Sequence, residues 1–177
     1  DPDTAELNTL VEACRRVGVT SAVVPPTFPI DVADHLRANG IELSVDRDLF
    51  VMRRRVKTPE ELAGIRRAQI AAEAGVSHVA DALDRSEIGA DGGLLLDGVP
   101  LTCEDLKTGI REAYLRNGCD DAGMIVAHGA QTCIGHHAGS GQIFAGEPVT
   151  VDICPRDIVS GGNSDMTRTF VKGEINE

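Results

Sequence analysis

The sequence predicts an α/β protein in two parts, an α/β segment over residues 1–50 and an α+β segment over residues 51–177. The first part alternates predicted helices with strands, the order that is typical of a parallel α/β layer. The second part gives two helical patterns followed by strands. With 177 residues and 42% hydrophobic content, the chain can bury a core and hold one domain plus part of another.

Four elements are predicted in the first part. They are a helix near Asp3–Val17, a strand at Ser21–Val24, a helix near Ile30–Ala38 and a strand at Ile41–Val45. Each helix stops before a glycine, Gly18 or Gly40, because glycine readily adopts the left-handed conformation that ends helices. The short apolar runs between them read as strands.

The second part opens with the sequence KTPEE, which follows a charged boundary segment at Leu49–Lys57. Thr58 can cap a helix, Pro59 suits the first helical position and Glu61 completes a capping box. The apolar residues that follow recur at steps of three and four. They are Leu62, Ile65, Ala68, Ala72, Val76, Val79 and Leu83. We expect this stripe to face the core, with no cofactor implied.

The segment Ser86–Pro100 is rich in Gly and Asp and is predicted to be a loop. Its Asp91–Gly93 run does not fill the liganding positions of a calcium loop, so we predict no calcium site there. A second helix is expected after Thr102, with Asp105 three residues on, and Asn117 with the following glycine ends it.

Two strands are predicted near the end of the chain. Val149–Ile153 alternates apolar and polar residues, and Met166–Val171 is rich in β-branched and apolar residues. Between them, Pro155 and the run Ser160–Asn163 supply turn chemistry. The chain is therefore expected to reverse there and to pair the two strands antiparallel.

Asp152 and Asp165 fall in this strand-loop-strand setting. Aspartate is a poor strand former, so its placement there costs stability unless it binds something. Two close carboxylates repel each other, and a divalent cation between them removes that cost. The spacing alone also allows the alternative in which one Asp caps the loop and the other faces solvent.

The stretch Val149–Phe170 resembles the pita-bread metallopeptidases, the superfamily of methionine and Xaa-Pro aminopeptidases, prolidases and creatinases. The family signature is a strand V-x-[VI]-D followed by S-D-x-T-R-T-F, and it matches Val149–Asp152 and Ser164–Phe170. The run VAHGAQTCIGHH at Val126–His137 is similar to the family segment that leads to a substrate-facing histidine. The KTPEE sequence is typical of the start of the family's catalytic domain. The resemblance extends over Lys57–Gly173.

For the fold, the resemblance implies the first half of a pita-bread domain over residues 51–177, preceded by the tail of an α/β N-terminal domain over residues 1–50. For the activity, it implies a dinuclear metal-dependent peptidase of the Xaa-Pro aminopeptidase or prolidase type. Such an enzyme cleaves a peptide bond with a metal-activated hydroxide. The implied partner is a peptide substrate with proline at the second position.

The resemblance also implies a role for each matched residue. Asp152 would chelate one divalent metal ion and Asp165 would bridge two. His136 would hydrogen-bond the substrate or the charge that develops on it, and Gln131 stands where many members have Asn. The neighbouring His137 is equally available, and only the resemblance prefers His136. Hard oxygen ligands with imidazole suit manganese, cobalt or zinc.

The family completes its five metal ligands with one His and two Glu from segments that normally follow this one. Glu174 and Glu177 lie too near the end of the sequence to replace them. We therefore expect this chain to be a fragment that binds metal weakly and does not turn over alone. We also expect it to expose an apolar face and to form a homo-oligomer.

Two other functions stay open. A pseudo-peptidase would keep the fold and bind peptides or proteins without metal, and a creatinase-like hydrolase would use the same fold without metal. The presence of both Asp152 and Asp165 together with His136 favours the metallopeptidase.

Three further histidines are expected to lie outside the catalytic site. His128 would make a backbone contact, while His35 and His78 would be helix residues without a site. Cys154 lies two residues after Asp152 and shares its face of the predicted strand, where it is expected to be a small buried residue.

Composition excludes other classes of function. A net charge of −11 without a basic stripe beyond Arg53–Arg55 argues against nucleic-acid binding. No apolar run approaches the roughly 20 residues that cross a bilayer, so no membrane partner is expected. Five cysteines without a C-x-x-C spacing argue against a disulfide framework and favour a reducing compartment, which predicts a cytoplasmic protein.

Overall fold

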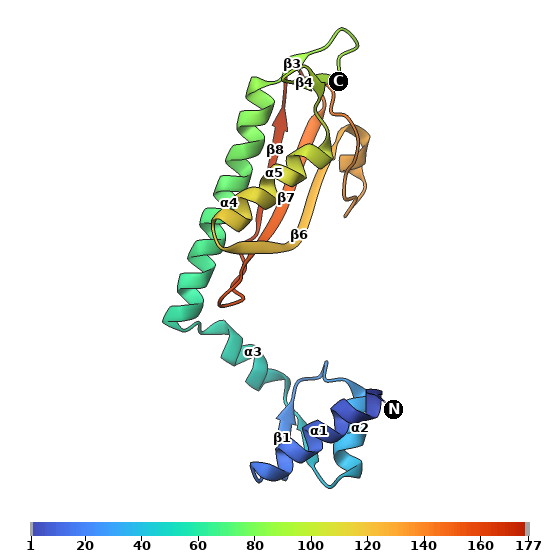
Figure 1. Ribbon diagram of the computed structural model, residues 1–177, viewed down its shortest axis with the longest axis vertical. Helices are drawn as coiled ribbons and strands as arrows, with labels where there is room; N and C mark the ends of the chain where they lie inside the picture. Colours follow the sequence, from blue (N-terminus) through green and yellow to red (C-terminus); the bar gives the residue numbers. More distant parts are fainter. Residues whose placement is uncertain (1, 176–177) are drawn as a thin grey trace. The chain divides into compact units, whose positions relative to one another are not determined.

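The computed structural model describes residues 2–175, and the chain divides between Lys57 and Thr58 into two compact units (Figure 1). This division falls at the end of the charged segment that the sequence marks as a boundary. Each unit has its own cluster of buried apolar residues. The two units are therefore described separately.

The first unit alternates helices and strands as predicted. Its elements are α1 (Pro2–Arg16), β1 (Ser21–Val24), α2 (Ile30–Ala38), β2 (Glu42–Val45) and α3 (Arg47–Arg55). Strands β1 and β2 pair in parallel, with Val24 opposite Val45. Val11, Leu36 and Ile41 form the buried centre of this unit.

Helix α3 was not predicted. It occupies most of the charged boundary segment, and none of its residues is buried. The Asp46 carboxylate caps it by accepting hydrogen bonds from the backbone N–H groups of Asp48 (2.9 Å) and Leu49 (3.0 Å). These bonds satisfy two of the donors that a helix leaves unpaired at its start.

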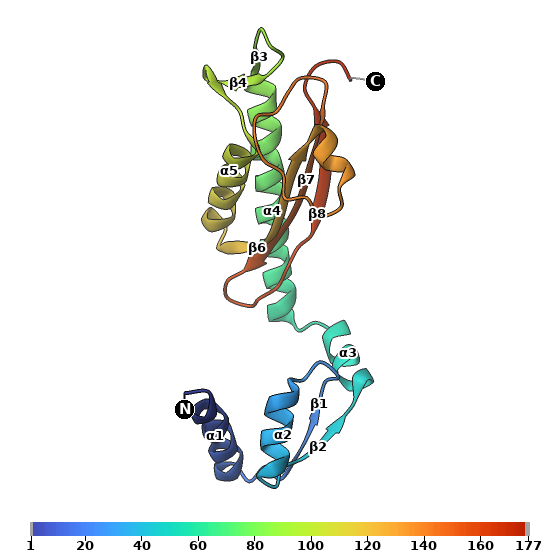
Figure 2. The ribbon, with the colours of Figure 1, turned by 90° about the vertical axis from the view of Figure 1, so that its right-hand side faces the viewer.

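In the second unit, two helices pack on an antiparallel sheet (Figure 2). The helices are α4 (Pro59–Arg85) and α5 (Cys103–Arg116), and the strands are β6 (Cys119–His128), β7 (Pro148–Asp157) and β8 (Met166–Val171). The strand order is β6-β7-β8, so β7 is central. The predicted antiparallel pairing of the last two strands is confirmed, with Asp152 opposite Thr167.

Both helices of this unit begin as predicted. The Thr58 hydroxyl accepts from the backbone N–H of Glu61 at 3.2 Å, and the Glu61 carboxylate accepts from the backbone N–H of Thr58 at 2.8 Å. Thr102 and Asp105 make the equivalent reciprocal pair at the start of α5. Each capping box satisfies two orphan donors, which fixes where the helix starts.

Small residues on α4 bring this helix close to its neighbours. Ala68, Ala71 and Ala72 are fully buried. A Cβ placed on Gly75 would lie 3.1 Å from Ile110 of α5 and 3.4 Å from Ile153 of β7. Because packed cores leave few voids, larger residues here would separate α4 from both α5 and the sheet.

The prediction of a loop at Ser86–Pro100 is wrong for part of that segment. It contains β3 (Glu87–Ile88), β4 (Leu94–Leu96) and β5 (Val99–Pro100), which form a small antiparallel sheet. Asp97 (φ 53°) and Gly98 (φ 78°) connect the last two strands. Positive φ at two successive residues is the requirement of a two-residue type I′ hairpin, and Asp-Gly is a preferred sequence for it.

The turn predicted at Pro155 is also wrong, since β7 continues past it to Asp157. Proline cannot donate to a strand ladder and is tolerated at a bulge. Pro155 lies opposite Asp121, at the edge of a register shift in β6 between Asp121 and Met124. The irregular pairing explains how this proline fits within a central strand.

None of the helices in the described part of the chain combines the length and apolarity that a membrane crossing requires.

The Tyr114 hydroxyl provides a test of this core. Tyr114 is fully buried on α5, and its hydroxyl oxygen has no hydrogen-bond partner among the described residues. A buried polar group without a partner costs about 1–3 kcal/mol. We therefore expect Tyr114→Phe to raise the free energy of unfolding by about 1 kcal/mol, measured by urea denaturation.

Ile110→Ala, one turn earlier on the same helix, is the matched control for that experiment. It should lower the free energy of unfolding by about 2–5 kcal/mol, because it leaves a cavity in the same core. A loss of stability in Tyr114→Phe would show that the hydroxyl has a stabilising partner.

Candidate active site

A cavity of about 240 Å³ lies on the side of the sheet that turns away from α4 and α5. Alternation along β7 buries Val149, Val151 and Ile153 in the core, so Thr150 and Asp152 point to the opposite face. The cavity is lined by Ile125, Ala127, Gln131, Thr132, Ile134, Gly135, His136, His137, Thr150, Asp152 and Thr167. It thus brings the candidate catalytic histidine and one candidate metal ligand together.

Asp152 is held in place by the neighbouring strand. Thr167 lies directly opposite it on β8, and the Thr167 hydroxyl donates a 2.6 Å hydrogen bond to Asp152 Oδ1. The bond fixes one carboxylate oxygen and leaves the other oxygen able to accept a cation or a proton donor. Antiparallel pairing therefore orients the first candidate ligand.

Asp165 lies immediately before β8, is exposed, and is not among the residues that line the cavity. It lies beside the half-buried Cys154. Burial raises the pKa of the Cys154 thiol. The Asp165 carboxylate, which also hydrogen-bonds the thiol, raises this pKa further, and so does the Asp152 carboxylate. Both aspartates thus act electrostatically on the same thiol and favour its protonated form.

The two carboxylates fit part of a metal site. Their hard oxygen atoms suit a divalent cation, and a cation bound between two carboxylates would relieve their mutual repulsion. Within residues 2–175, no group of three or more His, Cys, Asp or Glu side chains is placed to hold a metal ion. Catalytic zinc sites typically take about three protein ligands, so the described residues supply only some of the ligands.

His136 and His137 differ in what their rings contact. The His137 Nδ1 accepts a 3.0 Å hydrogen bond from the backbone N–H of Gly139, which uses the ring to close a turn. His136 is exposed and has no hydrogen-bond partner in the part of the chain that the structure describes. Its ring therefore remains available to a bound molecule.

The backbone of His136 is strained, with φ at 62°. Left-handed backbone is uncommon for residues other than glycine, and such strain often lies at functional sites. No pattern in the sequence signals this conformation. It marks His136, of the two adjacent histidines, as the residue that the surrounding loop holds in an unusual position.

His128 makes the predicted backbone contact, since its Nε2 lies 3.3 Å from the carbonyl oxygen of Ser140. Its Nδ1 also lies 2.7 Å from Glu147 Oε2, a contact that the sequence did not predict. Gln131 pairs with both backbone groups of Ser140, donating to its oxygen and accepting from its nitrogen. Together these contacts close the loop that begins with the 3₁₀ helix η1 (Gly129–Cys133) and carries His136.

The same loop is anchored on β6 and α5. The Lys107 ammonium of α5 donates to the carbonyl oxygen of Gly139 at 2.6 Å. A Cβ on Gly139 would lie only 1.7 Å from the carbonyl oxygen of Val126, so only glycine fits this approach. The loop is therefore fixed at the cavity wall by contacts on several sides.

His35 and His78 are helix residues, as predicted, in α2 and α4. His35 Nε2 lies 3.1 Å from Asn8 Oδ1 within the first unit. The His78 ring faces Gly109, where an added Cβ would lie 1.9 Å from its Nε2, so it packs between α4 and α5. Neither histidine lines the cavity.

The model of metallopeptidase family M24 matches residues 63–177 of this sequence. The chain belongs to metallopeptidase family M24. The matched range contains the cavity, both candidate ligand aspartates and His136. No curated protein matches the sequence of this M24 chain.

Solved structures resemble the M24 chain at low sequence identity. The prolidase from Pyrococcus horikoshii OT3 matches with a TM-score of 0.73 and 21% identity, over 94% of this chain and 45% of its own. The X-Pro aminopeptidase from Thermotoga maritima MSB8 matches with a TM-score of 0.69 and 15% identity, over 97% of this chain and 46% of its own. The X-prolyl aminopeptidase from Caenorhabditis elegans, a cytosolic enzyme with a di-nuclear active site, matches with a TM-score of 0.65 and 17% identity. The match extends over 98% of this chain and 28% of its own.

These matches confirm the predicted fold class, a pita-bread fold of which this M24 chain holds a part. The chain spans less than half the length of each of the three structures.

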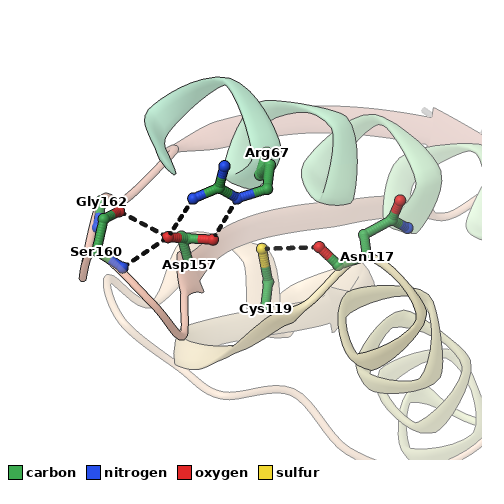
Figure 3. A network of polar contacts seen from close by, with 6 residues as sticks. All are labelled: Arg67, Asn117, Cys119, Asp157, Ser160 and Gly162. Carbon is green, nitrogen blue, oxygen red and sulfur yellow. Dashed lines mark hydrogen bonds and ion pairs between the residues drawn. The ribbon is translucent and has the colours of Figure 1, made fainter. Parts of the chain in front are cut away.

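An ion pair with a buried carboxylate fixes the segment that leads to Asp165 in this M24 chain (Figure 3). Arg67 of α4 makes a two-pronged contact with Asp157, from Nε to Oδ1 at 2.7 Å and from Nη2 to Oδ2 at 3.0 Å. The backbone N–H and the hydroxyl of Ser160 also donate to Asp157 Oδ2. Asp157 is only 1% exposed, so its charge depends on these donors. Sequence reasoning missed this pair, because its partners lie 90 residues apart.

This network predicts a pH dependence of stability. The hydrogen bonds from Arg67 and then from Ser160 hold the pKa of the Asp157 carboxyl far below its usual range. Its stabilising effect is therefore fully present above the unfolded-state pKa of about 4 and is lost as the pH falls below that value. Asp157→Asn should lower the urea midpoint at neutral pH, and it should flatten the decline of that midpoint as the pH falls from about 5 to about 2.

The exposed Asp97→Asn serves as the control, because Asp97 makes only a surface pair with Arg85. Its stability should follow the pH dependence of the unsubstituted chain. If the urea midpoint of Asp157→Asn falls with pH as steeply as that of the unsubstituted chain, the proposed role of the Arg67–Asp157 pair is contradicted.

Proposed function

We propose that this chain forms part of a dinuclear metal-dependent peptidase of the Xaa-Pro aminopeptidase or prolidase type. The observation that carries the proposal is the cavity in which His136 and Asp152 meet, in a chain that belongs to metallopeptidase family M24. The implied substrate is a peptide with proline at the second position. The names of the similar structures, prolidases and X-Pro aminopeptidases, support this choice of substrate.

Asp152 and Asp165 would hold the metal ions in this enzyme. Asp152 would bind one ion, and Asp165 would bind both. When bound, two such ions lower the pKa of a shared water and polarise the scissile carbonyl. Manganese, cobalt and zinc all suit carboxylate and imidazole ligands. The di-nuclear active site named for the Caenorhabditis elegans enzyme supports a two-metal site here.

His136 would act on the substrate directly. Its ring lines the cavity and has no partner among the described residues, so its N–H can donate to the oxygen on which charge develops. The contacts of His128, Gln131 and Lys107 hold the loop in place before the substrate arrives. A donor fixed in advance stabilises developing charge without reorganising during the reaction.

The remaining ligands would come from outside residues 2–175, because the described residues contribute only the two aspartates. We therefore infer that this chain alone binds metal weakly and does not turn over. We also propose that it self-associates, since the family's second half would cover an apolar face.

All five cysteines are free, which supports a cytoplasmic location for the enzyme.

A second candidate is a non-catalytic peptide-binding module with the same fold. Metal binding decides between the two functions.

Metal binding is tested first with Asp165→Asn. Replacing the bridging carboxylate by a neutral amide should abolish calorimetrically detectable manganese binding to the complete enzyme. Asp81→Asn, on the exposed side of α4, is the matched control and should bind manganese like the parent. Equal binding by Asp165→Asn and the parent would contradict the proposed site, and absence of manganese binding by the parent would favour the non-catalytic module.

The role of His136 is tested by kinetics of the complete enzyme on an Xaa-Pro dipeptide. His136→Ala should lower kcat by about 10²–10³-fold, the usual cost of one lost donor to developing charge, while manganese affinity stays unchanged. His35→Ala, in the first unit, should leave kcat unchanged. An unaltered kcat in His136→Ala would shift the role to His137 or to another residue.

A further inference from the structure

Helix α4 holds both ends of the segment Asp157–Ser164, which leads directly into Asp165. At the first end, Arg67 contacts both carboxylate oxygens of Asp157, at 2.7 and 3.0 Å (Figure 3). At the second end, the Ser164 hydroxyl donates to Gln69 Oε1 at 2.6 Å. Two residues of one helix turn thus fix the position at which the segment leaves β7 and the position at which it returns.

The segment packs directly on the backbone of α4. A Cβ on Gly64 would lie 1.7 Å from the Ser160 hydroxyl oxygen, and a Cβ on Gly162 would lie 2.8 Å from the backbone nitrogen of Ile65. No side chain fits between these two surfaces without moving one of them. The segment therefore follows the helix, and its shape is not free to vary.

Ser164, the last residue of the segment, is held by several contacts. It is 8% exposed, its backbone N–H donates to the carbonyl oxygen of Pro155 at 3.1 Å, and its hydroxyl binds Gln69. The Gln69 amide is itself oriented, because its Nε2 donates to Glu73 Oε1 at 3.0 Å and so turns its oxygen toward Ser164. Asp165 itself is exposed, so its position depends on the residue before it.

We propose that Gln69 is a positioning residue for Asp165, acting through Ser164, with Arg67 and Asp157 fixing the other end of the segment. This inference rests on the proposed function. A ligand that is already in place loses less freedom when it binds a cation, so anchoring raises metal affinity without a contact to the metal. The Glu73–Gln69–Ser164 chain is the path by which α4 sets the position of the carboxylate.

The test uses a loss variant and a rescue variant. Gln69→Leu keeps the size of the side chain and removes the acceptor for Ser164. The double variant Gln69→Glu with Glu73→Gln reverses the amide–carboxylate pair and restores an oxygen that accepts from Ser164. Arg66→Lys, a neighbouring change on the exposed side of α4, is the control.

Manganese affinity of the complete enzyme is the first readout, by calorimetry and by the electron paramagnetic resonance of the bound ion. Gln69→Leu should weaken binding about 10–100-fold, as is usual for residues that orient a ligand, and the double variant should restore it. Arg66→Lys should bind like the parent. Parent-like affinity in Gln69→Leu, or failure of the double variant to restore affinity when its unfolding midpoint matches that of the parent, would overturn the inference.

Amide hydrogen exchange of the metal-free chain is the second readout and does not depend on the proposed function. Gln69→Leu should speed exchange at Ser164 and Asp165, while exchange in α5 stays unchanged. Unchanged exchange at those two residues would overturn the inference even if the metal site exists. Absence of manganese binding in the parent enzyme would instead overturn the proposed function and leave the exchange result to decide the role of Gln69.

Discussion

The close packing of α4 on β7 and α5 is the constraint on which the second unit depends. Ala68, Ala71, Ala72 and Gly75 present almost no side-chain volume, so the helix backbone lies near its neighbours. Because α4 lies so close, the side chains of Arg67 and Gln69 can reach the segment that follows β7. Packing in the core and the geometry near Asp165 are therefore parts of one arrangement.

Much of this fold was predictable because its signals are local. The capping box at Thr58 and the alternation along β7 each depend on residues within a few positions of one another. The hairpin at Asp97 and Gly98 was also readable from its Asp-Gly sequence, although the loop prediction overlooked it. The turn prediction at Pro155 was wrong, because proline is tolerated within β7 only through a bulge in another strand, β6.

The candidate site was predictable only in part. Asp152 and Asp165 stand out as polar residues in strand settings, and the resemblance to a known family singled out His136. The contact of His128 with Glu147 and the pair of Arg67 with Asp157 join residues 19 and 90 positions apart, and no local pattern reports such contacts. The positive φ of His136 is likewise a property of the folded loop and not of its sequence.

The glycines at the close approaches restrict how this sequence can change over time. Gly64 and Gly162 lie where the Asp157–Ser164 segment touches α4, and Gly139 lies where the histidine-bearing loop touches β6. One added carbon would displace backbone at Gly139 and Gly162, and at Gly64 it would displace the Ser160 side chain. Divergence among relatives would therefore be expected to spare these three positions, while exposed residues such as Ile158 and Val159 change more freely. The same geometry that shapes the site thereby limits the paths open to its evolution.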